Sequence, residues 1–307
     1  MSTRYAMPGP NEPCWCGSTR KYKQCHRAID LAAPEDKYSE AQRIYAVNWR
    51  VTADAQSKRG DYDWMSRQLK KYGINRLLDI GCGSGHGILS MLSEFGSDLR
   101  VVAVDENPSC LSTTKDTLQK AGHAPALVSR IETQPTNFGY RSVYSAITEE
   151  LPAPICLLQA DVCSDPHLLS ALQADGLFDA VTVWLNGVHM QRQDHEVVRD
   201  AGVESDYAHR LFVQNAAYEL ADKVLRSGGV LQVVDRGESL SNDALTEDIL
   251  RSHREQAGPT TLDVIEVDHT PWSAPEGKRV PMVQTPGTSG RVANGDMALI
   301  SVISVKS

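Results

Sequence analysis

A glycine-rich turn between a short apolar run and a helical stretch constrains the fold of this chain more than any other segment. The apolar run at 76–80 reads RLLDI, and GCGSGHG follows it at 81–87. Glycine lets the backbone turn sharply and approach a ligand closely. The helical stretch Ile88–Phe95 offers free N–H groups at its start. Together they predict a site for a nucleotide-like ligand at the carboxyl end of this strand.

Further apolar runs extend this unit into a sheet. Four of them lie at residues 99–105, 155–161, 178–185 and 229–235. Because these continuous runs alternate with helical patterns, they predict a parallel sheet covered by helices on both faces. Two β-rich segments, 262–270 and 297–306, flank a Pro/Gly-rich stretch and predict an antiparallel pair at the sheet edge. We therefore expect an α/β fold: a Rossmann-like, doubly wound, mostly parallel sheet with antiparallel C-terminal edge strands.

Three helices and one loop complete the expected layout. Apolar and aromatic residues recur at helical spacing from Lys37 to about Ala55. A second helix fits Tyr62–Tyr72 with a glycine as its C-cap, and a third begins near Pro108. We interpret residues 132–154 as an insertion loop.

The glycine spacing discriminates between nucleotide ligands. The dinucleotide fingerprint G-x-G-x-x-G fails in every register, because its last position falls on His86, Ile88 or Ser90. The phosphate-binding loop G-x-x-x-x-G-K-[ST] is absent as well. A carboxylate, Asp79, precedes the glycines. It would repel a pyrophosphate and suits a ligand with an ammonium group, so a nicotinamide-dependent oxidoreductase is disfavoured.

Acidic residues and further glycines follow the predicted strands in a fixed order. After DIGCGSG come VVAVDENP, QADV, FDAVTVWLNGVHM and ADKVLRSGGVLQVVD. In order and spacing, residues 76–235 resemble a class I S-adenosylmethionine (SAM)-dependent methyltransferase. NPPY-like tetrapeptides and a Pro-Cys nucleophile, which are typical of DNA-modifying members, are absent after the fourth strand.

The resemblance implies a set of SAM-binding residues: Asp79, Gly81, Cys82, Gly83, Gly85, Asp105, Glu106, Asp161, Val162 and Trp184. The glycine loop would wrap the methionine part of SAM, with Cys82 packed as a small apolar residue. Asp105 would accept both ribose hydroxyls, and Asp161 would lie near the adenine amino group. Taken singly, Asp105 could instead be a strand-end cap and Asp161 a helix N-cap.

The acceptor side is less defined. The resemblance implies that His189 lies near the acceptor, where it could take a proton from a hydroxyl or amine. It could equally be a loop histidine bonded to backbone. The polar residues 190–206 form either a lid or a solvated loop. The first helix, with Tyr45 and Trp49, either covers SAM or packs against the sheet edge.

The first 30 residues have their own pattern, C-x-C-x8-C-H, formed by Cys14, Cys16, Cys25 and His26. Three thiolates and one imidazole make a complete structural zinc set. Free thiols or a disulfide are the alternative, although a Cys14–Cys16 disulfide would close a strained ring. Residues 9–26 resemble the SEC-C zinc-binding motif. We thus expect a zinc knuckle at 1–30 and a methyltransferase domain at 37–307, with its helices at 37–72 covering the SAM site.

Charge distribution bears on the acceptor. Of 31 basic and 39 acidic side chains, residues 1–27 hold five and one, a local charge of +4 within a total of −8. The acidic remainder lacks the positive field that binds nucleic acid. A small-molecule acceptor, bound wholly within 37–307, is therefore our first expectation. A protein or RNA acceptor recruited through the knuckle, and a non-catalytic SAM-binding regulator, are the alternatives.

The sequence also predicts where the protein resides. No run approaches the ~18 apolar residues of a membrane helix. The first residues, MSTRYAMPGPNEPC, lack the apolar region of a secretory signal. We expect a cytoplasmic protein with no membrane partner.

Overall fold

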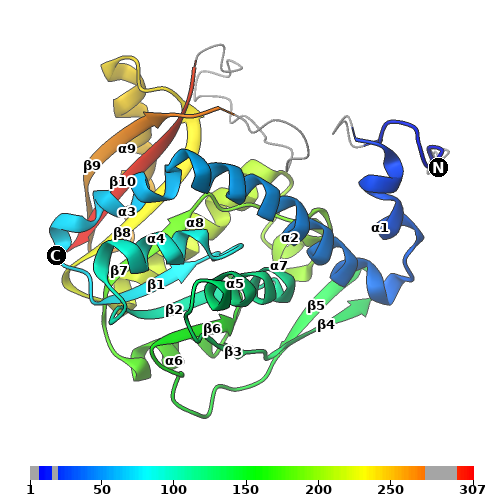
Figure 1. The fold of residues 1–307 in the computed structure, drawn as a ribbon, viewed down its shortest axis with the longest axis horizontal. Helices are drawn as coiled ribbons and strands as arrows, with labels where there is room; N and C mark the ends of the chain where they lie inside the picture. The colour runs from blue at the N-terminus through cyan, green and yellow to red at the C-terminus, as the bar shows by residue number, and fades with distance from the viewer. Residues whose placement is uncertain (1–6, 16–19, 274–295) are drawn as a thin grey trace.

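The computed structural model describes residues 7–15, 20–273 and 296–307 of the chain. In this part, eight strands form one sheet (Figure 1): β1 (Arg76–Ile80), β2 (Arg100–Asp105), β3 (Ala126–Val128), β6 (Ile155–Gln159), β7 (Phe178–Trp184), β8 (Leu225–Glu238), β9 (Leu262–Pro271) and β10 (Met297–Lys306). Their order is β3-β6-β2-β1-β7-β8-β10-β9. The strands from β3 to β8 pair in parallel, while β10 is antiparallel to both β8 and β9. The predicted fold class is confirmed.

Helices cover both faces of the sheet, because successive strand residues point to opposite sides. Leu77 belongs to a core beneath α2 (Pro34–Arg59), α3 (Asp61–Gln68), α4 (His86–Phe95) and α5 (Pro108–Lys120). Leu78, the next residue, belongs to a second core beneath α6 (Leu168–Asp175), α8 (Asp206–Val224) and α9 (Asp243–Ala257). Both cores combine aliphatic residues with aromatic and sulfur-containing ones, all of them buried.

The predicted helices are present, with shifted ends. α2 is longer than the expected span of 37–55 and ends at Gly60, whose φ of 80° is left-handed. The expected helix 62–72 divides into α3 and the 3₁₀ helix η2 (Lys70–Tyr72). α5 begins at Pro108 as predicted, and the Asn107 side chain caps it by accepting a hydrogen bond from the N–H of Ser109.

The prediction of an insertion loop at 132–154 was wrong. β4 (Ile131–Thr136) and β5 (Gly139–Tyr144) form an antiparallel hairpin within it. The sequence pattern of β4 is weak because it contains Pro135, and proline, which has no backbone N–H to donate, is rare within strands. The hairpin is anchored by Tyr140, whose hydroxyl donates to the carbonyl of Pro34 at 2.9 Å. It thus packs against the start of α2.

The N-terminal module contains the 3₁₀ helix η1 (Tyr22–Gln24) and α1 (Arg27–Leu31). In Figure 1 it lies near the N-terminal end of α2, far from the C-terminus. Arg20 joins it to α2 by donating a 2.6 Å hydrogen bond to the side-chain oxygen of Asn48. A small cluster of Cys14, Tyr22 and Cys25 forms its interior.

Two remaining expectations concern the membrane and the C-terminal stretch. No helix in the described ranges is both long and apolar enough to cross a membrane. Most of the Pro/Gly-rich stretch before β10 lies outside the described residues.

Candidate functional site

The carboxyl ends of β1, β2, β6 and β7 meet at one edge of the sheet, where the chain order reverses between β1 and β7. This is the position at which doubly wound sheets bind ligands. A cavity of about 70 Å³ lies there. Of the predicted SAM-binding residues, six line it: Gly81, Gly83, Asp105, Glu106, Asp161 and Val162. The structure therefore brings together residues that are far apart in the sequence.

The other four predicted residues surround this cavity without lining it. Asp79 is buried and accepts a 2.7 Å hydrogen bond from the hydroxyl of Thr182. Cys82 is buried among apolar residues. Gly85 caps the start of α4 with φ of 82°. The Trp184 indole N–H donates to Gln232, at 2.9 Å. Their SAM-binding roles stay predictions.

The glycine loop requires glycine at its centre. Gly83 has φ of 58°, and a Cβ there would lie 2.3 Å from Nε1 of Trp49. The indole of Trp49 thus packs directly on the loop backbone. Trp49 and Tyr45 also line the cavity, so α2 forms part of its wall. That the helices at 37–72 cover bound SAM stays a prediction.

Two carboxyl groups at this edge have perturbed acidity. Burial raises the pKa of Asp79 to about 6, against the opposing hydrogen bond from Thr182. Burial and the neighbouring Glu106 raise the pKa of Asp105 to about 7. The Asp105 carboxylate accepts from the N–H groups of Gly83, at 3.1 Å, and Asn107, at 2.9 Å. Among the residues that the structure describes, neither carboxyl group has a cationic partner, which a positively charged ligand would supply.

Glu106 and His189 contact each other in the wall of this cavity. Nε2 of His189 lies 3.2 Å from Oε1 of Glu106, although neither ring nitrogen has a well-aligned hydrogen bond. Gln42, from α2, donates to Glu106 at 2.8 Å. Burial alone would raise the pKa of Glu106, but His189, Arg192 and Gln42 together lower it to about 2. Glu106 is therefore ionised, and the catalytic role of His189 stays a prediction.

Asp161 forms an ion pair that the sequence did not reveal. Arg192 donates to its carboxylate at 2.5 Å, and the backbone N–H of Cys163 donates at 3.0 Å. Arg192 belongs to the 3₁₀ helix η3 (Met190–Asp194), which precedes α7 (Glu196–Asp200). Because Arg192, His195 and Val198 are buried, the first half of the segment 190–206 is packed against the site, whereas residues 199–202 are exposed.

A second, larger cavity of about 530 Å³ adjoins the first. Tyr45, Trp49 and residues 186–189 line both cavities. The second cavity is also lined by Trp15, Arg20 and His26 of the N-terminal module. The N-terminal module therefore forms part of the wall of this cavity, and an acceptor pocket wholly within 37–307 stays a prediction.

Two polar residues that the sequence analysis did not predict also line these cavities. His209 of α8 lines the first cavity, and burial lowers its pKa to about 4. Arg236 lines the second cavity and lies near the carboxyl end of β8, after the fully buried part of the strand. Because ligands bind at the carboxyl ends of parallel strands, a charged residue at this position could have been predicted to lie in the site.

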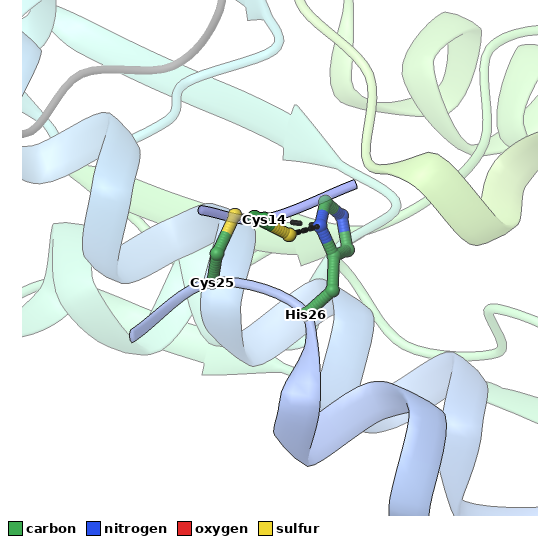
Figure 2. Close-up of side chains that lie close together, drawn as sticks. All are labelled: Cys14, Cys25 and His26. Atoms are coloured by element: carbon green, nitrogen blue, oxygen red, sulfur yellow. Dashed lines mark hydrogen bonds between the residues drawn. The ribbon is translucent and has the colours of Figure 1, made fainter. Parts of the chain in front are cut away.

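The side chains of Cys14, Cys25 and His26 converge (Figure 2). Nδ1 of His26 lies 3.0 Å from Sγ of Cys14 and 3.3 Å from Sγ of Cys25. All three ligand atoms lie within 4.8 Å of one another, which suits one ion with bonds of about 2.0–2.3 Å. Burial lowers the pKa of His26, which favours the neutral imidazole that binds metals. The fourth predicted ligand, Cys16, lies outside the described residues.

The first cavity fits SAM in its chemistry. Carboxylates suit an ammonium group and hydroxyl donors, and apolar residues such as Ile80, Ala160 and Leu185 suit a flat base. Its volume is below the roughly 300–1,000 Å³ of ligand pockets. A ligand of that size would extend beyond this cavity, and the larger cavity described above shares part of its wall.

Comparison with known proteins identifies the N-terminal segment. Residues 11–28 match the SEC-C motif. This match covers only the knuckle. No curated protein matches the chain.

Similar solved structures cover most of the chain at low identity. TomG, an O-methyltransferase from Streptomyces achromogenes involved in tomaymycin synthesis, is 14% identical, with 85% of this chain and 90% of TomG covered and a TM-score of 0.42. An O-methyltransferase from Bacillus cereus is 12% identical, with coverages of 91% and 95% and a TM-score of 0.40. TrmN from Thermus thermophilus is 13% identical, and the chain spans 48% of its length with a TM-score of 0.43. These likenesses say nothing about the acceptor.

Proposed function

We propose that this protein is a SAM-dependent methyltransferase that acts on the oxygen or nitrogen of a small molecule. The observation that carries the proposal is the convergence of Asp105, Glu106 and Asp161, from two strand ends, on a cavity beside the glycine loop. A carboxylate before such a loop suits an ammonium group rather than a pyrophosphate. The absence of the dinucleotide glycine spacing supports the same assignment.

The side chains of the site would bind and orient the reactants. When bound, SAM supplies a methyl group on a positively charged sulfur, which departs as a neutral thioether as the acceptor lone pair attacks. Positioning supplies most of the rate in such a reaction. His189, held beside the ionised Glu106, is placed to accept the proton that a hydroxyl or amine acceptor loses. Glu106 would stabilise the resulting imidazolium.

The N-terminal module would hold a structural zinc ion through Cys14, Cys16, Cys25 and His26. Such closed four-ligand sites stabilise small modules that have little apolar core of their own. The described part of this module has only the three-residue cluster noted above.

Calorimetry with SAM tests the proposal. Replacing Asp105 by Ala removes a charged acceptor from two hydroxyls, worth ~1.5–3 kcal/mol for each bond, so SAM affinity should fall at least tenfold. Asp116→Ala, an exposed carboxylate on α5, is the matched control and should leave it unchanged. Equal affinity in wild type and Asp105→Ala would refute the assignment. Release of the demethylated product in the presence of a metabolite extract would separate an enzyme from a non-catalytic binder.

One observation favours a protein or RNA acceptor instead. Lys21, Lys23 and Arg27 are exposed on the knuckle, whereas Arg20 is turned towards α2. If they dock a macromolecule, methyl transfer by the wild type to protein or RNA fractions should weaken steeply as salt rises. A Lys21→Gln/Lys23→Gln/Arg27→Gln variant should lose that transfer at low salt and show a shallower salt dependence. Unchanged transfer to a metabolite fraction supports our first proposal.

A further inference from the structure

The side chain of Arg236 lines the 530 Å³ cavity. Its Nε and one of its terminal nitrogens are buried without a hydrogen bond. Among the residues that the structure describes, it has no ion-pair partner; its guanidinium carbon lies 5.7 Å from the ring centre of Trp272. Buried donors in native proteins are nearly always satisfied, and a buried cation without an anion is costly. Burial accordingly lowers the pKa of Arg236 to about 10, despite the nearby Asp235.

The other charged groups around this cavity have partners. Arg210 pairs with Asp235 at 2.8 Å. Arg20 donates to Asn48 and, at 3.2 Å, to Sγ of Cys25. Asp206, the carboxylate of the cavity wall, accepts from Gln193 at 3.5 Å. Arg20 has one buried donor, Nε, without a hydrogen bond, but both of its terminal nitrogens are bonded. Among the described residues, Arg236 is therefore the cation of this cavity with the most unsatisfied buried donors.

Trp15 gives the same cavity a preorganised aromatic surface. Trp15 stacks on His26, with ring centres 4.6 Å apart, and its indole N–H donates to Asp30 at 3.0 Å. Its side chain nevertheless remains 54% exposed. Because two contacts fix the indole, it offers a flat apolar face at little entropic cost.

We infer that the methyl acceptor is an organic anion with an apolar body, whose carboxylate or phosphate group binds Arg236 while its body packs against Trp15 of the zinc knuckle. This inference rests on the proposed function and specifies its acceptor. Residues 186–189 line both cavities, so an anion held at Arg236 extends towards the site where the methyl group would arrive. Guanidinium binds both kinds of anion through paired N–H bonds. The SEC-C motif thus contributes a wall of the acceptor pocket.

Binding of simple anions to the full-length, zinc-loaded protein tests the role of Arg236. The probes are acetate and inorganic phosphate, which distinguish a carboxylate site from a phosphate site. We expect at least one to bind and its affinity to fall tenfold or more in Arg236→Gln. Arg59→Gln is the matched control, because Arg59 stacks on the same Trp272 ring at 5.8 Å but pairs with Asp61. It should bind the probe as wild type does.

Two results would overturn the inference: wild type that binds neither probe, or Arg236→Gln that binds as tightly as wild type. SAM affinity, measured in every variant, reports folding. If Arg236→Gln fails to fold, Arg236→Lys replaces it and should show weakened binding, because ammonium cannot form the paired bonds. Absent SAM binding with intact anion binding would refute the proposed function and leave the anion site standing.

Benzoate, as a third probe, tests whether Trp15 of the zinc knuckle contacts the apolar body of the ligand. It should bind more tightly than acetate in wild type, and Trp15→Ala, checked for retained zinc, should remove that difference. An unchanged preference would show that Trp15 is not part of the pocket. Methyl transfer from labelled SAM to metabolites retained on an anion exchanger is the matching activity result. Transfer confined to unretained metabolites would contradict an anionic acceptor.

Discussion

The guanidinium of Arg192 and the carboxylate of Asp161 form an ion pair with a 2.5 Å contact, and their side chains are only 3% and 4% exposed. This pair fastens the segment after β7 to the end of β6, which closes one side of the predicted SAM site. Arg192 also donates to the hydroxyl of Tyr38, at 3.4 Å, from α2. One buried cation, Arg192, thus connects the segment after β7 with the end of β6 and with α2.

Breaking this pair should strongly destabilise the fold. Arg192→Gln leaves the Asp161 carboxylate buried without its cation, which costs about 3–5 kcal/mol, as measured by urea unfolding without SAM. Arg43→Gln removes a pair with Glu40 in which the arginine is 56% exposed, and should cost at most about 1 kcal/mol. The double variant Arg192→Gln/Asp161→Asn should recover part of the loss. A loss equal to that of Arg43→Gln would show that the buried pair contributes little.

A methyl group on Gly83 should be costlier than one on Gly73. Both residues have left-handed φ, of 58° and 62°, so alanine at either is strained by about 1–2 kcal/mol. A Cβ at Gly73 meets nothing within 4 Å, whereas at Gly83 it meets Trp49. Gly83→Ala should therefore unfold at lower denaturant concentration and bind SAM more weakly. Equal unfolding midpoints for the two variants would show that Trp49 readily moves away.

SAM affinity should rise with pH across the range in which Asp79 and Asp105 ionise. Burial raises their pKa values to about 6 and about 7, so protons compete with a cationic ligand below these values. In the ligand-free protein the same protonation stabilises the fold fully below about pH 4, and this contribution is lost as pH rises through 6 to 7. Calorimetry between pH 5.5 and 8 should show the trend in wild type and a flatter profile in Asp79→Asn. A flat wild-type profile would contradict it.

Purified protein should contain about one zinc ion per chain. The double variant Cys14→Ser/Cys16→Ser should lose it, because thiolates are the metal ligands. Cys163→Ser is the control, since Cys163 lies outside the cluster, and should retain zinc. SAM binding should survive in both variants, because the sheet has cores of its own. Full zinc in the double variant would show that the ligand set is wrong.

The sequence by itself determined the elements whose signals are local. The run RLLDI is β1 at the predicted residues, because apolar runs followed by glycine turns specify a buried strand wherever they stand. The ligand types Cys14, Cys25 and His26 were also readable from spacing, since η1 and a short turn bring them together. The hairpin β4–β5 escaped prediction, because Pro135 weakens the strand pattern and its anchor, Tyr140, acts on distant Pro34.

Only the tertiary structure decided which polar residues are buried and with whom they pair. Arg192 stands in the polar stretch 190–206, where its identity is equally compatible with a solvated loop. Arg192 pairs with Asp161, 31 residues away. Asp161 follows β6 and Arg192 follows β7, and the sheet order β6-β2-β1-β7 places the ends of both strands at the same edge of the sheet. The same holds for the contact of Glu106 with His189 and for Arg236 and Trp15, which line one cavity. The sequence shows which side chains are charged. The order of the strands and the packing of α2 against the sheet determine whether each of these side chains contacts water, another residue or a ligand.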